Sequence, residues 1–256
     1  MWWAARSCWK TPSPSLAPRS KGARIRVSIP EFSIPITRAA FWSQEPLPGV
    51  ASDPFLDTAS GPPDTAFIEP LLRRRLSALG RGMLHCAGRV AADVPELRSV
   101  FASQHGEPSR TMPMLEDLAH GLDISPTQFS MNVHNAVAGI WSISRQDSSA
   151  CTALGAGPET FGWGLLEAYS LHRSHGGAPV LFVYGDDRLP EVLTEFEPMQ
   201  APLHALAFLI AAPAARQLRI RRDPSVKGAA AAQSLRCLAA MANGPANTGA
   251  WAWTWV

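Results

Sequence analysis

The chain has 256 residues and a mass of 27.6 kDa, enough for one large domain or two small ones. An apolar fraction of 46% and a charged fraction of 17% exclude a solvated disordered chain, and a formal net charge of +2 predicts that nucleic acid is not a partner. No apolar run reaches the roughly 18 residues of a membrane-spanning helix, so we expect no membrane span.

The cysteines and the first residues bear on location. Cys8, Cys86, Cys151 and Cys237 lie far apart, which predicts neither a structural zinc site nor a disulfide framework and favours a reducing, cytoplasmic setting. The segment before residue 27 is basic, has no acid and lacks the continuous apolar stretch of a secretory signal. We expect residues 1–24 to be a disordered basic tail or the product of a wrongly assigned start codon, and we rank an organellar transit peptide below both.

The first ordered elements are expected to be short. Frequent prolines from Pro30 to Pro70 predict short strands joined by loops. From Glu69 to Val90, apolar residues at three-to-four spacing predict one amphipathic helix that its glycines weaken. Residues 98–104 then predict a strand, and residues 113–120 predict a short helix that ends at a glycine.

From residue 125 onward the pattern predicts layers of strands and helices. Apolar and small residues up to Trp141 predict a tightly packed helix, and residues 151–156 predict a short buried strand. Pro158 and Glu159 suit the first turn of a further helix. Strands are predicted over residues 179–185, 204–212 and 217–221, followed by an Ala-rich helix and an alternating Trp segment that forms an edge strand or a docked end. This order is typical of an α/β domain with a sheet between helices.

Candidate chemistry is sparse. The common nucleophile, phosphate-binding and zinc-protease motifs are absent from the sequence. Cys151 and His134 are the one plausible Cys/His pair, although a buried cysteine more often acts as a small apolar residue. Asp186 and Asp187 follow a strand and are either metal ligands or, more commonly, a solvated turn.

One long segment resembles a known family. It runs SPTQFSMNVHNAVAGIWSI from Ser125 to Ile143, preceded by FASQHGE and followed by GAGPETFGWGLLEA. This segment resembles the β-ketoacyl synthase-like proteins that consist of the N-terminal domain alone, called chain length factor-like and similar to proteins of aryl-polyene and fatty-acid-type pathways. The motif residues are Ser125, Pro126, Phe129, Ser130, His134, Asn135, Ala138 and Gly139.

The resemblance covers about residues 24–221 and implies a thiolase-like α/β fold, of which 256 residues suffice for the first half. We therefore expect a synthase-like domain over residues 25–222, followed by a helix and a Trp-rich tail over residues 223–256. Where the synthases carry their nucleophilic Cys, this chain has Gly157, Pro158 and Glu159. The two His contexts of the condensing enzymes are also missing, since after residue 185 the one histidine is His204.

The sequence therefore predicts a non-catalytic subunit without cofactor or metal. It is expected to pair with a catalytic β-ketoacyl synthase, or with itself, through the strand at 151–156 and the helix at 130–143. Two alternatives remain open. One is an active acyltransferase or thioesterase that uses Cys151 and His134, and the other is a scaffold that docks acidic acyl carrier proteins through Arg73–Arg75 and Arg81.

Overall fold

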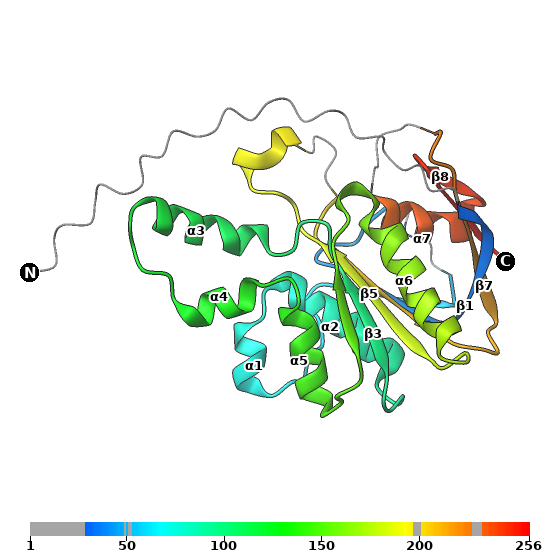
Figure 1. Ribbon diagram of the computed structural model, residues 1–256, viewed down its shortest axis with the longest axis horizontal. Coiled ribbons are helices and arrows are strands. Elements are labelled where there is room, and N and C mark those ends of the chain that lie inside the picture. The colour runs from blue at the N-terminus through cyan, green and yellow to red at the C-terminus, as the bar shows by residue number, and fades with distance from the viewer. Residues whose placement is uncertain (1–28, 49, 51–52, 197–200, 227–231) are drawn as a thin grey trace, which may run out of the picture.

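The computed structural model describes residues 29–48, 50, 53–196, 201–226 and 232–256. In these ranges one mixed sheet has the strand order β4-β3-β5-β6-β1-β7-β9-β8, with β2 attached to β1. Helices cover both faces of the sheet (Figure 1), which confirms the expected class. The predicted tail, residues 1–24, lies outside the described residues.

The element bounds are as follows. The strands are β1 (Ile29–Ser43), β2 (Leu56–Ser60), β3 (Arg98–Ala102), β4 (Cys151–Leu154), β5 (Val180–Asp186), β6 (His204–Ile210), β7 (Arg216–Arg222), β8 (Ala246–Thr248) and β9 (Trp251–Trp255). The helices are α1 (Pro70–Arg75), α2 (Ala78–Ala91), α3 (Pro108–Ala119), α4 (Pro126–Asn132), α5 (Ala136–Arg145), α6 (Thr160–Ser174) and α7 (Gln233–Asn243), with short 3₁₀ helices η1 (Gly157–Glu159) and η2 (Glu191–Phe196).

The central strand, β1, contradicts the expectation of short strands after Pro30. It runs for 15 residues, pairs with β7 in its first half, and pairs with β6 and β2 in its second half. The pairing register shifts between Ile29 and Phe32 and again between Ile36 and Arg38. The first irregularity spans Pro30, which lacks the N–H group that a regular ladder needs, whereas Pro35 pairs in register with Gln217 of β7.

Two apolar cores lie on the two faces of the sheet. Alternate residues of β5 point to opposite faces, so that Leu181 and Val183 pack towards α2 and α5 while Phe182 and Tyr184 pack towards α6 and α7. All seven residues of β5 are buried, which confirms the predicted strand covered on both sides. In contrast, β4 is an edge strand whose Cys151 is exposed, so the expectation of a buried strand there is wrong.

The helix predicted from Glu69 to Val90 is two helices. Leu76 has an extended backbone after α1, and Ser77 caps α2 by accepting a hydrogen bond from the Gly80 amide at 2.8 Å. Gly82 lies against the ring of Trp42, where a Cβ atom would come within 2.2 Å of a ring carbon. This glycine therefore serves close packing between α2 and β1, which sequence periodicity does not reveal.

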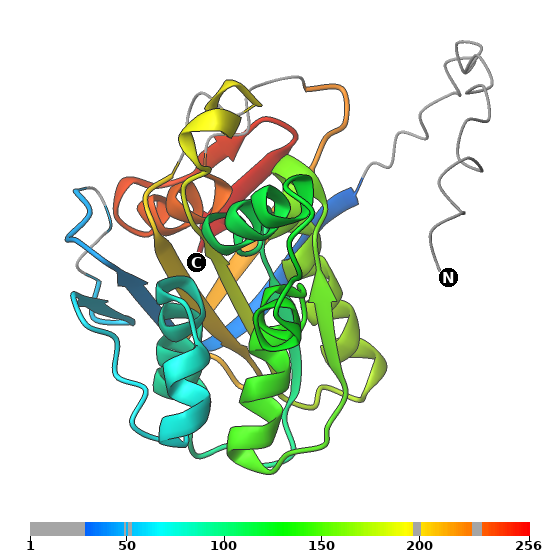
Figure 2. The same ribbon diagram turned by 90° about the vertical axis from the view of Figure 1, so that its left-hand side faces the viewer.

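Two helices extend away from the sheet. In Figure 1, α3 and α4 form an arm on the left of the molecule, and Figure 2 views this arm end-on. α3 begins before the predicted start at residue 113 and contains Pro113. The single helix predicted from Ser125 to Trp141 is divided into α4 and α5, because the chain between them leaves the helical conformation at Val133.

The chain after residue 223 contributes to the same sheet. β9 lies between β7 and β8 and is therefore not the edge strand that the Trp alternation suggested. Trp251 and Trp253 are fully buried, with the rings of Trp163 and Phe161 against them at 5.5 and 5.3 Å. The division of the chain at residue 222 stays a prediction. Within the described ranges, no helix combines the length and apolar character of a membrane span.

Candidate functional site

The junction between β4 and α6 holds Gly157, Pro158 and Glu159, the residues at which the resemblance predicts that the synthase nucleophile is missing. The chain leaves the edge strand, forms the short helix η1, and enters α6 at Thr160. The Thr160 hydroxyl accepts a hydrogen bond from the Ala156 amide at 2.8 Å and donates one to the Gly157 carbonyl at 2.7 Å. These bonds fix the turn in which Gly157, Pro158 and Glu159 stand, and none of the three carries a thiol.

Glu159 is bound by residues from two distant strands. Its carboxylate accepts hydrogen bonds from Arg222 Nε at 2.8 Å and from the Trp251 indole nitrogen at 3.0 Å. The Arg222 guanidinium holds the pKa of Glu159 below its ordinary value. Arg222 in turn lies over the rings of Trp163 and Trp251, at 5.0 and 5.8 Å. Glu159 therefore anchors α6 to β7 and β9.

A side chain from α7 occupies the first turn of α6. Gln233 is buried, and its Oε1 accepts a hydrogen bond from the Gly162 amide at 3.2 Å. The free amides at a helix start are the groups that stabilise a thiolate or an oxyanion. Here one of them, the Gly162 amide, is already bonded to Gln233, so it is not available to a thiolate or an oxyanion.

A buried histidine, His204, lies beside this junction. The Nε2 atom of His204 is 2.7 Å from the Ser234 hydroxyl, and its Nδ1 is 2.8 Å from the Pro202 carbonyl. Because a carbonyl only accepts, Nδ1 carries the proton and Nε2 accepts from Ser234. Burial lowers the pKa of His204, which favours this neutral form. The adjacent cavity, of about 20 Å³, accommodates no more than a water-sized group.

Asp186 organises the loop that leads to the arm. Its Oδ1 accepts hydrogen bonds from the Ser103 hydroxyl at 2.8 Å and from the amides of Gln104 and His105 at 2.9 and 3.2 Å, and its Oδ2 accepts one from the Tyr184 hydroxyl. Asp187 accepts from the Arg188 amide. In the part of the chain that the structure describes, no group of three or more His, Cys, Asp or Glu residues is arranged to hold a metal ion.

The structure does not bring Cys151 and His134 together. Cys151 begins β4, whereas His134 lies beyond the other end of that strand, with its Nε2 3.3 Å from where a Cβ of Gly155 would stand. Four residues of extended chain separate these positions by about 13 Å. Partial desolvation also raises the pKa of the Cys151 thiol, which disfavours the reactive thiolate.

The motif residues lie along α4 and α5. Ser125 caps α4 and Pro126 occupies its first turn, Asn135 precedes α5, and Ser130 donates a hydrogen bond to the Thr127 carbonyl at 2.9 Å. Ala138 is buried against the core, whereas Phe129, His134 and Gly139 are exposed. Between α3 and α4 lies a groove of about 400 Å³ lined by residues that include Met114 and Met131.

Sequence reasoning missed the polar contacts that close the junction. Gln233 reaches Gly162 across 71 residues of sequence, and Arg222 reaches Glu159 across 63. Neither pair lies in a motif or at a helical or strand spacing. Only the folded sheet brings them together, so no local signal was present to find.

Residues 42–255 match the family model described as β-ketoacyl synthase, N-terminal domain. No curated protein matches the chain. A chain in the complex of the ketosynthase ApeO with its chain length factor ApeC from Xenorhabdus doucetiae is 25% identical, with a TM-score of 0.70 over 88% of this chain and 99% of that chain.

Two further structures align less closely. A β-ketoacyl synthase from Burkholderia phymatum STM815 is 9% identical, with a TM-score of 0.49 over 59% of this chain and 46% of that chain. The ishigamide ketosynthase/chain length factor is 17% identical, with a TM-score of 0.45 over 64% and 51%. The family model covers most of the sheet and its helices, which confirms the expected thiolase-like fold. The chain belongs to the β-ketoacyl synthase N-terminal domain family.

Proposed function

We propose that this chain is a non-catalytic, chain length factor-like subunit that pairs with a catalytic ketosynthase in polyketide or fatty-acid-type biosynthesis, aryl-polyene pathways included. Its similarity to a chain of the ApeO–ApeC complex, over 88% of this chain and 99% of that chain, supports the proposal. That complex joins a ketosynthase to its chain length factor.

The start of α6 supports the absence of condensing activity. A covalent acyl-enzyme needs a nucleophile there, activated by the helix terminus. This chain instead has Glu159, whose charge is neutralised by Arg222, and Gln233, which occupies the Gly162 amide. The buried pair of His204 and Ser234 adjoins a cavity of only about 20 Å³, too small for an acyl thioester.

The observation that carries the pairing proposal is the apolar surface of the arm. We call it the arm surface, and it consists of the exposed side chains of Leu115, Leu118, Leu122, Phe129 and Val133, together with Ile143 on α5, which adjoins α4. In α3 only Pro108 and Met114 are buried, and in α4 no residue is buried. Helices that bury almost nothing within their own chain gain little stability from it, so a partner is needed to cover them.

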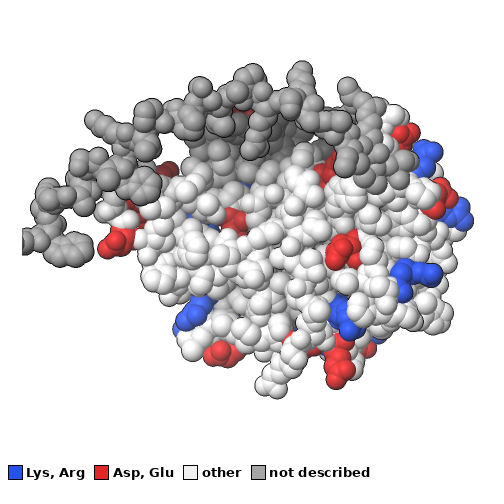
Figure 3. Space-filling view, viewed as in Figure 1, with Lys and Arg blue, Asp and Glu red and all other residues white. Residues whose placement is uncertain are grey.

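The edge of the sheet offers a second element of the same interface. Beyond β4 no described strand continues the sheet, so its outer backbone groups are available for pairing with another chain. α5 adjoins β4 and carries Ile143, which is 62% exposed. Figure 3 views the face that includes the arm, where charged side chains are scattered around a largely uncharged surface. Such a surface suits an apolar interface.

Size-exclusion co-elution with the cognate ketosynthase at micromolar concentration tests the pairing. We expect Leu118→Glu and Phe129→Glu, at positions 55% and 58% exposed, to leave the fold intact and weaken the complex at least tenfold. The matched control is Val256→Glu, 55% exposed and next to β9 at the far end of the sheet. Co-elution that the arm variants leave unchanged contradicts the proposal. So does a wild-type chain that forms only a homodimer.

Intact-mass measurement separates this proposal from the acyltransferase alternative. Incubation of the chain with an acyl thioester is expected to leave its mass unchanged, because the Cys151 thiol has a raised pKa and His134 lies at the other end of β4. An acyl adduct on Cys151 would favour the acyltransferase.

An acidic acyl carrier protein is a further partner that the charge pattern suits. Arg73, Arg74 and Arg75 form the last turn of α1, and none of them takes part in an ion pair with the described residues. Salt-sensitive carrier binding that charge reversal of these residues abolishes would support this role.

A further inference from the structure

A groove of about 650 Å³ crosses α2 and α5 on the outer side of the molecule. Its aromatic, basic and hydrogen-bonding side chains are those of Phe67, His85, Arg89, Trp141, Ser144 and Arg145. Trp141, Ser144 and Arg145 share one face of α5 because they are three and four residues apart. Ile143 of the arm surface points to the opposite face, so this groove is separate from the proposed ketosynthase interface.

Three donors in this groove have no partner. The indole nitrogen of Trp141, the hydroxyl of Ser144 and the Nε of Arg145 are buried without a hydrogen bond. Only six side-chain polar atoms in the described residues are in this situation, and half of them belong to residues that line this one groove, where they lie just beneath its surface. Trp141 is 2% exposed. An unsatisfied buried donor costs about 1–3 kcal/mol, so three on one helix face indicate a place where an acceptor belongs.

His85 supplies a fourth donor. Its Nδ1 is 3.0 Å from the Asp64 amide and accepts that N–H. The same Nδ1 lies 3.2 Å from the Asp64 carbonyl, and Nε2 is a donor in the neutral tautomer whose Nδ1 accepts from the amide. His85 is 9% exposed and lines the groove from α2, opposite the donors of α5.

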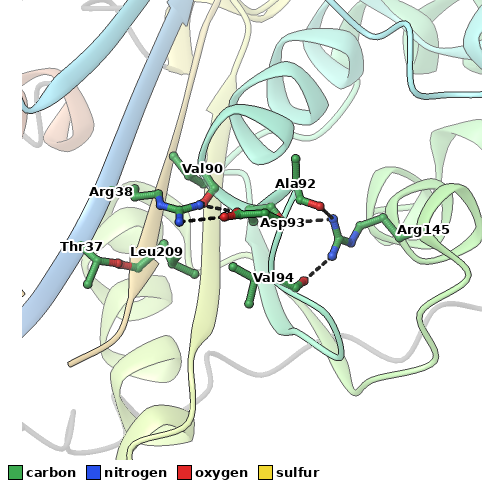
Figure 4. A network of polar contacts seen from close by, with 9 residues as sticks. Thr37, Arg38, Val90, Ala92, Asp93, Val94, Arg145 and Leu209 are labelled. Atoms are coloured by element: carbon green, nitrogen blue, oxygen red, sulfur yellow. Dashed lines mark hydrogen bonds and ion pairs between the residues drawn. The ribbon is translucent and has the colours of Figure 1, made fainter. Parts of the chain in front are cut away.

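The charges of the groove are fixed in place. The terminal nitrogens of Arg145 donate hydrogen bonds to the carbonyls of Ala91, Ala92 and Val94, at the end of α2 and just after it. Figure 4 shows Arg145 near the ion pair of Arg38 and Asp93. The Arg145 guanidinium therefore cannot turn away, while its Nε stays unpaired. Arg89 adds a second cation, paired with Asp57 at 2.5 Å. The Asp64 carboxylate, which accepts from the Ala66 amide at 3.0 Å, opposes these cations in part.

Aromatic rings form the apolar wall. Phe67 stands edge-on to Trp141 with ring centroids 6.0 Å apart, and the Arg145 guanidinium lies 4.7 Å from the centre of the Trp141 ring. Phe67 is 43% exposed and lies over Gly88, where a Cβ atom would come within 3.0 Å of its ring. Phe67 therefore lies between α2 and α5, beside Trp141, with part of its side chain exposed in the groove.

We propose that this groove binds a small molecule in which a carboxylate or phosphate group is attached to a flat apolar body. The oxyanion accepts from the donors of Trp141, Ser144, Arg145 and His85, and the flat body packs on Phe67. The indole and guanidinium N–H groups only donate, so they suit an oxyanion rather than a metal ion, which needs lone pairs. The volume lies within the range of small-molecule sites.

The indole N–H resonance of Trp141 reports on the site. Among nine tryptophans it is identified as the ¹⁵N–¹H indole signal that Trp141→Phe removes. Phenyl phosphate and benzoate are expected to shift it in a saturable manner, and inorganic phosphate is expected to act more weakly. The stronger of the two aromatic probes distinguishes a phosphate from a carboxylate ligand. The proposal is overturned if no probe shifts the signal at about 10 mM, or if benzylamine shifts it equally.

Ser144→Ala supplies the second test, and exposed Ser148→Ala is its matched control. Removal of an unpartnered hydroxyl is expected to leave the melting temperature of the free protein unchanged or raised, while the affinity for the better probe falls roughly five- to tenfold. The control is expected to change neither quantity. A Ser144→Ala protein that melts lower but binds as tightly would mean that the hydroxyl has a structural role, and the proposal would fail.

Discussion

Gly162→Ala tests the packing of α6 on the C-terminal strand. Gly162 stands in the first turn of α6, and a Cβ atom there would come within 2.4 Å of the Trp251 ring. Carbon atoms need a separation of about 3.5–4.0 Å, so the ring must move by roughly 1 Å or more. Trp251 has little freedom to move, because it stacks on Trp253 at 5.7 Å and donates to Glu159 at 3.0 Å.

The expected magnitude follows from two opposing terms. Overpacking against a ring that cannot move costs about 3 kcal/mol, while replacing a helical glycine by alanine contributes about 1 kcal/mol of stability. Gly162→Ala is therefore expected to lower the free energy of unfolding by about 2 kcal/mol. Gly139→Ala is the matched control, since Gly139 lies in α5 and a Cβ there meets nothing within 4 Å. It is expected to raise the free energy of unfolding by about 1 kcal/mol.

Thermal unfolding of both variants measures the contrast. For a chain of this size, 1 kcal/mol corresponds to roughly 2–4 °C, so the two melting temperatures are expected to differ by about 6–12 °C. If Gly162→Ala melts at or above the wild-type temperature, the tryptophan is not held against α6 and the reasoning fails. If both variants fall together, the loss does not come from the Trp251 contact.

The remaining predictions concern acid stability, measured as the denaturant midpoint across a pH series. Because Arg222 lowers the pKa of Glu159 in the folded chain, the pair stabilises the fold above the ordinary carboxyl pKa of 4.5, and this stability is lost as the pH falls through the lowered value. Glu159→Gln is expected to lower the midpoint at pH 7 and to flatten the acid limb. An unchanged acid limb would mean that the Arg222 bond contributes nothing. Burial lowers the pKa of His204 from 6.5, so stability contributed above that value is lost on acidification below it. His204→Asn is expected to remove this slope, and a slope that persists would assign it to another group.

Much of the fold was predictable because the middle of the chain follows simple patterns. The apolar run that forms β5 has the composition of a strand covered on both faces, and all its residues are buried. The strand β6 was predicted for the same reason, β7 was predicted from a run with alternating apolar residues, and Pro158 with Glu159 indicated the start of α6. In each case the local pattern and the tertiary environment agree.

The errors share a physical cause. Proline counts indicated short strands, but β1 shifts its pairing register at Pro30 and keeps Pro35 in register with β7, and both depend on strands far along the chain. Cys151 and its neighbours have the composition of a buried strand and yet occupy the edge of the sheet. Helical periodicity continued through Ser77 and Val133, where capping and an extended backbone divide the helices. Propensity alone cannot reveal such tertiary effects.

The candidate site was predictable only in part. The resemblance predicts that the synthase nucleophile is missing at Gly157, Pro158 and Glu159, and this assignment stays a prediction. The residues that close the junction, Gln233 and Arg222, come from distant parts of the sequence and carry no motif. The groove between α2 and α5 likewise depends on Phe67, Gly88 and Trp141 meeting in space.

The central place of β1 determines when the sheet is able to form during synthesis. Thr37 donates a hydrogen bond to the Leu209 carbonyl, 172 residues later in the chain. At about 5–20 residues per second, roughly 10–30 s pass between the synthesis of these two strands. During that interval β1 exists without β6 and β7, the two strands that pair with most of its length in the folded sheet. Productive folding must therefore wait for β6 and β7, and the nascent chain is a natural client for chaperones that shield unpaired strands.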